Sequence, residues 1–62
     1  MKLTHRDAEW EFEGRMTVRQ AVEKAGLIPG TVLAVREGRL LTEDTVLEPD
    51  DMVKLVSVIS GG

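Results

Sequence analysis

Polar and apolar positions alternate near the N-terminus in a way that is typical of a β-hairpin. Trp10 and Phe12 alternate with three glutamates, so an extended chain would place the rings on one face and the carboxylates on the other. A shorter segment, residues 2–6, precedes this run and is separated from it by a turn around residues 7–8. The pattern therefore predicts two strands, over residues 2–6 and 9–13.

A helix over residues 17–25 has the strongest local signals in the chain. Thr17 followed by Gln20 fits a capping box, in which the two side chains satisfy free backbone N–H groups at the helix start. Gly26 suits the left-handed position that ends a helix, and Leu27 can then fold back on the last turn, against Val22. Apolar residues at helical spacing form one stripe: Val18, Ala21, Val22 and Ala25.

The middle of the chain predicts a second hairpin. Residues 31–36 are rich in β-branched and apolar side chains, which favours a strand. Glu37-Gly38 is a plausible two-residue turn, and residues 39–41 form the returning strand.

The last third of the chain predicts a loop followed by a buried strand. Residues 42–51 contain Thr, Asp, Glu and Pro at a density typical of a loop, with one helical turn expected to dock through Val46 and Leu47. Residues 52–59 are apolar at nearly every position, which is typical of a strand in the middle of a sheet.

The element order is therefore ββαβββ, an α+β arrangement in which one helix covers one face of a mixed sheet. If the last strand lies centrally and parallel to the first, the helix provides the crossover that a parallel pair needs. That is the β-grasp fold, and its rival is an unrelated small α+β roll with the same elements. We expect a β-grasp domain over residues 1–59 and a flexible tail over residues 60–62.

Composition excludes several functional classes. The 62 residues include no cysteine and one histidine, His5, so neither a disulfide nor the usual four-ligand zinc site can form, and we expect no bound metal. No apolar run approaches the roughly 20 residues that span a bilayer, and no signal-peptide core is present, so we expect a cytoplasmic protein without a membrane partner. A net charge of −3 and only two aromatic residues argue against direct binding of nucleic acid.

The chain ends in Ser60-Gly61-Gly62, which places its candidate chemistry at the C-terminus. The two glycines have no Cβ atom, so this end of the tail can thread a narrow channel, and three extended residues reach about 10 Å. The Gly62 carboxylate would then be the reactive group inside another protein's active site. The alternative is a frayed end without function.

Three segments resemble the ubiquitin-like sulfur-carrier family: residues 32–41, residues 49–55 and the ending Val58-Ile59-Ser60-Gly61-Gly62. That family includes the thiamine-pathway carrier (ThiS), the small subunit of molybdopterin synthase (MoaD) and the carriers for tRNA thiolation. The short length and the tail look closer to the thiamine-type and tRNA-thiolation carriers. One departure is Pro49-Asp50-Asp51, which stands where these carriers often have Asp-Gly-Asp.

The resemblance implies a carrier and not an enzyme. An E1-like adenylating enzyme would use ATP and Mg²⁺ to activate Gly62, and this chain itself would bind no cofactor. A cysteine desulfurase or a rhodanese-type donor would supply the sulfur of a C-terminal thiocarboxylate. An acceptor enzyme, a thiazole synthase or a tRNA thiolase, would then take it.

Other functions use the same features. A ubiquitin-like modifier would join Gly62 to target lysines, a molybdopterin synthase small subunit would deliver sulfur to molybdopterin, and a structural or interaction module would leave both glycines incidental.

The last strand also predicts a partner-binding surface. Period-two alternation sends Val53 and Leu55 toward the helix and leaves Val56 and Val58 on the uncovered face. A small apolar patch there would resemble the docking surface of ubiquitin-like proteins, and its alternative is a thin sheet without a partner. The residues that we expect to contact a partner are Met52, Val56, Val58 and Ile59.

The remaining charged positions have plainer interpretations. Three glutamates on the second strand, Glu9, Glu11 and Glu13, are expected to form a solvated face. The carboxylates Glu48, Asp50 and Asp51 could steer a basic enzyme, although a charged loop is the commoner case.

Overall fold

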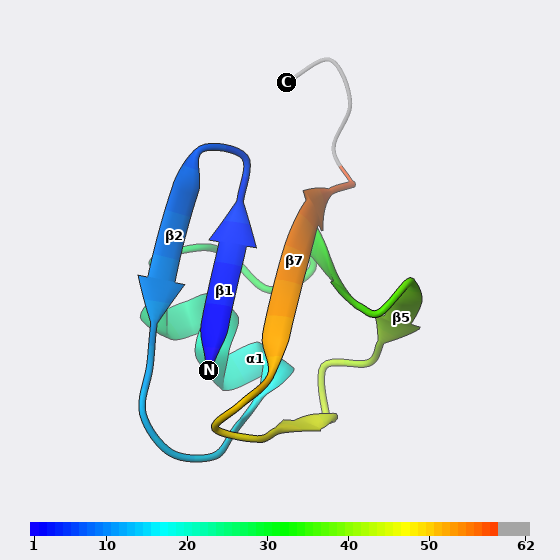
Figure 1. Ribbon diagram of the computed structural model, residues 1–62. Helices are drawn as coiled ribbons and strands as arrows, with labels where there is room; N and C mark the ends of the chain where they lie inside the picture. The colour runs from blue at the N-terminus through cyan, green and yellow to red at the C-terminus, as the bar shows by residue number, and fades with distance from the viewer. Residues whose placement is uncertain (59–62) are drawn as a thin grey trace.

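A mixed β-sheet with a helix packed on one face forms the body of the protein (Figure 1). The structure is a computed structural model that describes residues 1–58. Its elements are β1 (Lys2–His5), β2 (Ala8–Glu11), β3 (Met16–Thr17), α1 (Val18–Lys24), β4 (Val32–Arg36), β5 (Arg39–Leu41), β6 (Val46–Leu47) and β7 (Met52–Ser57). Within the described residues, five strands form the main sheet in the order β2-β1-β7-β4-β5, and β3 pairs with β6 in a separate ribbon.

The central position of β7 confirms the prediction made from its continuous apolar run. β7 pairs in parallel with β1, with Leu3 opposite Val53, and antiparallel with β4, with Ala34 opposite Leu55. Parallel neighbours need a long crossover, and the segment that contains α1 lies within it. The β-grasp arrangement is therefore confirmed, with β3 and β6 as two short additional strands.

The helix begins as the sequence predicts. The Gln20 N–H donates to Thr17 Oγ1 at 3.2 Å, and the Thr17 N–H donates to Gln20 Oε1 at 2.9 Å. This reciprocal pair is the predicted capping box. The helical residues are Val18–Lys24, so the predicted range 17–25 included the two caps.

The C-terminal end of α1 also follows its sequence signal. Gly26 has φ +82°, a conformation that costs glycine little, and its N–H donates to Glu23 O at 3.0 Å. The Leu27 N–H donates to Val22 O at 3.1 Å, which folds the chain back over the last turn. These two bonds form a Schellman motif and turn the chain toward β4.

The core lies between α1 and one face of the sheet. Trp10 and Phe12 are half-buried and pack against it, as the alternation on the second strand predicts. The buried residues of the core are Met1, Leu3, Met16, Val18, Ala21, Val22, Ala34, Leu47, Val53 and Leu55.

The first hairpin turns one residue earlier than the sequence predicts. In the pairing of β1 with β2, His5 lies opposite Ala8, so the two residues of the turn are Arg6 and Asp7. Arg6 has φ +56°, a region where glycine or asparagine is the common choice. The prediction of a turn around residues 7–8 overlooked this because nothing in the local sequence supplies the usual turn residue at position 6.

The helical turn expected within residues 42–51 is wrong, because residues 46–47 form the short strand β6. Met16 of β3 lies opposite Leu47, and Thr17 lies opposite Val46. Successive side chains of a strand point in opposite directions. Leu47 is therefore completely buried, whereas Val46 is 49% exposed.

We expect Leu47→Ala to lower the free energy of unfolding by about 3 kcal/mol, because the removed methyl groups leave a cavity in a small core. Val46→Ala is the matched control, and we expect a loss of less than about 1 kcal/mol at this half-exposed position. Urea denaturation of the two variants measures both values. Equal losses would contradict the strand geometry of residues 46–47.

Candidate partner-binding site

The two faces of β7 have opposite environments. Val53 and Leu55 point into the core and are each 2% exposed. Met52, Val56 and Val58 are large apolar residues on the other face, and they are 69%, 42% and 45% exposed. The structure thus places three of the predicted partner-binding residues on the face that α1 does not cover.

Neighbouring strands extend this apolar surface. Leu33 of β4 lies opposite Val56 in the register and is 42% exposed. Leu40 of β5 lies opposite Val35 and is 66% exposed. We name the surface formed by Leu33, Leu40, Met52, Val56 and Val58 the outer apolar patch.

Sequence analysis missed Leu33 and Leu40, although a signal was present. Period-two alternation within residues 32–36 separates Leu33 and Val35 from the buried Ala34. The unbroken apolar character of that strand hid the alternation, and only the pairing with β7 shows which set faces outward.

A shallow hollow of about 280 Å³ adjoins Met52 within the outer face. Val35 and Met52 contribute apolar surface to its lining, and Lys2, Lys54 and Glu37 also line it. Lys2 forms an ion pair with Glu9 at 3.3 Å. The hollow therefore offers apolar contact together with charges of both signs.

The other residues proposed for the site are Ile59, Ser60, Gly61 and Gly62, and they lie outside the described residues. They follow Val58 directly in the chain, and the Val58 N–H donates to Thr31 O at 3.0 Å. The attachment point of these residues therefore lies directly after β7, the strand that carries Met52 and Val56 of the patch.

The acidic residues before β7 form a local structural network. Asp51 Oδ2 accepts the Glu48 N–H at 2.8 Å and pairs with Arg36 Nη1 at 2.8 Å. Glu48 Oε1 in turn accepts a hydrogen bond from Arg15 Nε at 2.9 Å. The Glu48 N–H, helped by the Arg36 guanidinium, holds the pKa of Asp51 below its ordinary value of 3.8. These contacts give Asp51 and Glu48 a role in fixing the chain where it enters β7.

Within residues 1–58, no cluster of three or more His, Cys, Asp or Glu side chains is placed to hold a metal ion. In the same part of the chain, no helix has the length and apolar character needed to cross a membrane.

Comparison with known proteins identifies the family. The model of the ThiS family matches residues 1–62. The sulfur carrier protein TtuB of Thermus thermophilus is 41% identical over 54 residues, which cover 87% of this chain and 83% of that protein. The chain belongs to the ThiS family, whose members are ubiquitin-like sulfur carriers with the β-grasp fold. Proteins of this kind are carriers rather than enzymes.

We expect Asp51→Asn to weaken the dependence of stability on pH in the acidic range. Because the pKa of Asp51 is lowered in the folded state, its contribution is complete well above pH 3.8 and is lost as the pH falls through the folded-state value. Thermal melting between about pH 6 and pH 2 should show a smaller decline for Asp51→Asn than for the unmodified protein. Asp50→Asn, next to it in the chain, is the control for removal of a carboxylate. Identical pH profiles for Asp51→Asn and the unmodified protein would contradict the structural role of Asp51.

Proposed function

We propose that this protein carries sulfur as a thiocarboxylate on Gly62 and serves as a cosubstrate of larger enzymes. The observation that carries the proposal is the match to the ThiS family, which extends through Ser60-Gly61-Gly62 to residue 62. Similarity to a sulfur carrier protein over most of both chains supports the same role. The absence of cysteine fits it, because the sulfur must then be held on a carboxyl group.

Activation of Gly62 requires a good leaving group on its carboxyl carbon. A carboxylate oxygen would attack the α-phosphorus of ATP in an E1-like enzyme that holds Mg²⁺, forming an acyl adenylate and releasing pyrophosphate. The terminal sulfur of a persulfide, supplied by a cysteine desulfurase or a rhodanese-type protein, would attack the carbonyl carbon and expel AMP. A thiol would then attack the donor's cysteine sulfur in the resulting acyl disulfide, which releases the thiocarboxylate and joins the thiol and the donor cysteine in a disulfide.

The outer apolar patch suits the docking step of this cycle. Four of its five large side chains lie on the adjacent strands β7, β4 and β5, Val58 follows β7 directly, and all five are between 42% and 69% exposed. Exposed apolar surface of this kind marks protein contacts, and apolar residues form the centre of an interface. We infer that the adenylating enzyme and the sulfur acceptor seat on this patch while Gly62 reaches the reacting atoms.

The sulfur acceptor is proposed to be a thiazole synthase of the thiamine pathway or a tRNA thiolase that forms 2-thiouridine. Incubation of protein whose Gly62 thiocarboxylate carries labelled sulfur with each acceptor enzyme and its substrate distinguishes the two. Label in the thiazole assigns the first pathway, and label in tRNA assigns the second.

Protein purified from its own cells should contain a species that is heavier by the difference between one sulfur and one oxygen atom. Intact-mass analysis with fragmentation should place this difference on Gly62, because only the terminal carboxyl carbon is activated. A variant extended by one alanine after Gly62 is the control and should lack the heavier species. Conjugates that link Gly62 to lysine, with no thiocarboxylate at any stage, would instead support a protein modifier.

The docking role of the patch is tested by Val56→Asp. We expect a 10-fold or greater loss of kcat/KM for adenylation, on the order of a hot-spot substitution, because a carboxylate must then be desolvated in the interface. Ile28→Asp is the matched control, since Ile28 is 70% exposed in the loop between α1 and β4, outside the patch. Pyrophosphate release measures the rate, and circular dichroism checks the fold. Equal rates for the two variants would contradict the role of the patch.

A further inference from the structure

A second hollow lies beside the C-terminal end of β7, at the margin of the outer apolar patch. Its volume is about 360 Å³, and its lining residues are His5, Arg6, Lys54, Leu55, Val56 and Ser57. It lies where β1 ends in its hairpin turn while β7 continues to Ser57. The pairing of β1 with β7 ends at Thr4 and Lys54, whereas the pairing of β7 with β4 continues to Ser57.

A side-chain hydrogen bond joins the ends of β1 and β7 at this hollow. His5 Nε2 and Ser57 Oγ lie 3.1 Å apart, in a partly buried position. The bond connects the end of β1 to the last residue of β7. It therefore fixes the imidazole in the lining of the hollow.

The charges that line this hollow are positive. Arg6 and Lys54 contribute two cations, and none of the described residues that line the hollow is a carboxylate. Within residues 1–58, the ion pairs use other cations and leave Arg6 and Lys54 without a carboxylate partner. Asp7 follows Arg6 in the turn but does not line the hollow.

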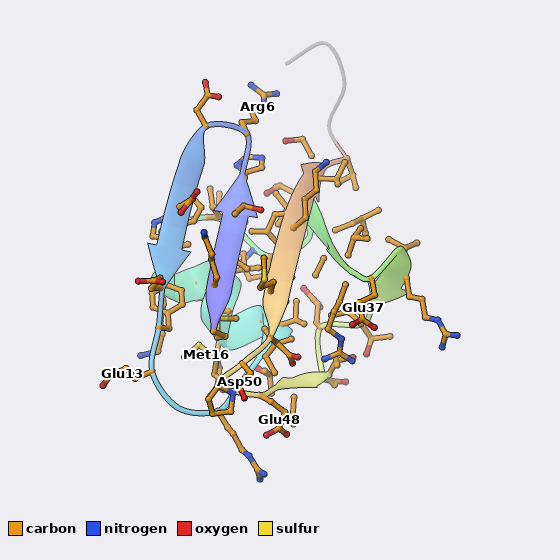
Figure 2. All side chains as sticks on the ribbon, viewed as in Figure 1. Arg6, Glu13, Met16, Glu37, Glu48 and Asp50 are labelled. Carbon is orange, nitrogen blue, oxygen red and sulfur yellow. The ribbon has the colours of Figure 1, made fainter. Side chains whose placement is uncertain are left out.

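This local charge contrasts with the net charge of −3 for the whole chain. Figure 2 shows Arg6 at the end of the molecule toward which β7 runs, and it shows Glu13, Glu48 and Asp50 at the opposite end. Arg6 therefore lies at the end of the molecule where residues 59–62 are attached, whereas Glu48 at the opposite end is paired with a cation of its own, Arg15.

Arg6 occupies its position at a conformational cost. Its φ is +56°, a region that disfavours residues with a Cβ atom, and the first position of a two-residue hairpin turn with φ above zero favours glycine, asparagine or aspartate. Glu37, at the first position of the other two-residue hairpin turn, has φ +53°. Strained residues are retained where surrounding structure or function requires them, and the exposed Arg6 side chain makes no ion pair within the described residues.

We propose that the hollow between the ends of β1 and β7 binds a side-chain carboxylate of the enzyme that adenylates Gly62, with Arg6 and Lys54 supplying the charge. The inference rests on the function proposed above. Val56 belongs both to the outer apolar patch and to the lining of the hollow, so a protein seated on the patch also covers the hollow. A carboxylate from that protein would meet two cations that have no carboxylate partner within residues 1–58, which favours rapid and correctly oriented association.

The test uses the full chain and the adenylating enzyme encoded in the same genome. We expect Arg6→Gly to raise the KM for this protein about 3- to 10-fold and to leave the KM for ATP unchanged, because a contact with the partner is lost. Arg6→Lys keeps the charge and should restore most of the affinity. The double variant Arg6→Glu, Lys54→Glu should raise the KM by more than about 30-fold, because two repulsive contacts replace two attractive ones.

Thermal melting separates this role from a structural one. Arg6→Gly relieves the positive φ, so we expect its melting temperature to be unchanged or to rise by up to about 5 °C while its KM worsens. Glu37→Gly relieves the same positive φ in the other hairpin and calibrates the expected rise in melting temperature; because Glu37 lines the hollow beside Met52, its KM does not serve as a control. Lys24→Ala controls for the loss of a positive charge at the end of α1.

Three outcomes would overturn the proposal. The KM of Arg6→Gly could equal that of the unmodified protein, the KM for ATP could rise in place of the KM for this chain, or the melting temperature could fall by several degrees. The second outcome would assign the cations to a phosphate, and the third would assign Arg6 to the fold. If the unmodified protein were not adenylated at all, the proposed function itself would fail, which is a different result.

Discussion

The pairing of β7 on both of its edges is the constraint on which the rest of the structure depends. β1 holds one edge in parallel and β4 holds the other antiparallel, so the register of one six-residue strand sets the register of its neighbours. Because side chains alternate, the same pairing buries Val53 and Leu55 beneath α1 and exposes Met52 and Val56. A slip of one residue would exchange these sets and place the core side chains in water.

The short helix can cover only one face of the sheet, and this limit has a functional consequence. With seven residues, α1 buries Val18, Ala21 and Val22 against the sheet. The opposite face keeps large apolar side chains exposed because no described element lies over it (Figure 1). A domain of this size thus presents a binding surface without a separate structure to build it, which suits a carrier that must dock on larger enzymes.

Charged side chains have different roles at the two ends of β7. Near the start of the strand they are engaged in the fold, since Asp51 binds the Glu48 N–H and the Arg36 side chain. Toward its end, Arg6 and Lys54 line a hollow in which none of the described lining residues is a carboxylate. The first group therefore stabilises the entry into β7, while the second lies beside the attachment point of the residues proposed to react.

Much of the fold follows from the sequence by itself, because its strongest signals are local. Three local signals each specify the backbone within a few residues: the capping box of Thr17, the glycine that ends α1 at Gly26, and the apolar run that begins at Met52. The structure confirms each of these predictions. The tail motif likewise predicted the family.

Tertiary structure alone decided three features that depend on distant partners. The pairing with Met16 and Thr17 makes residues 46–47 a strand, the register with β7 exposes Leu33, and the parallel pairing of β1 with β7 brings Arg6 and Lys54 to one hollow. Such contacts join residues up to about fifty positions apart, and no local pattern records which of them will meet.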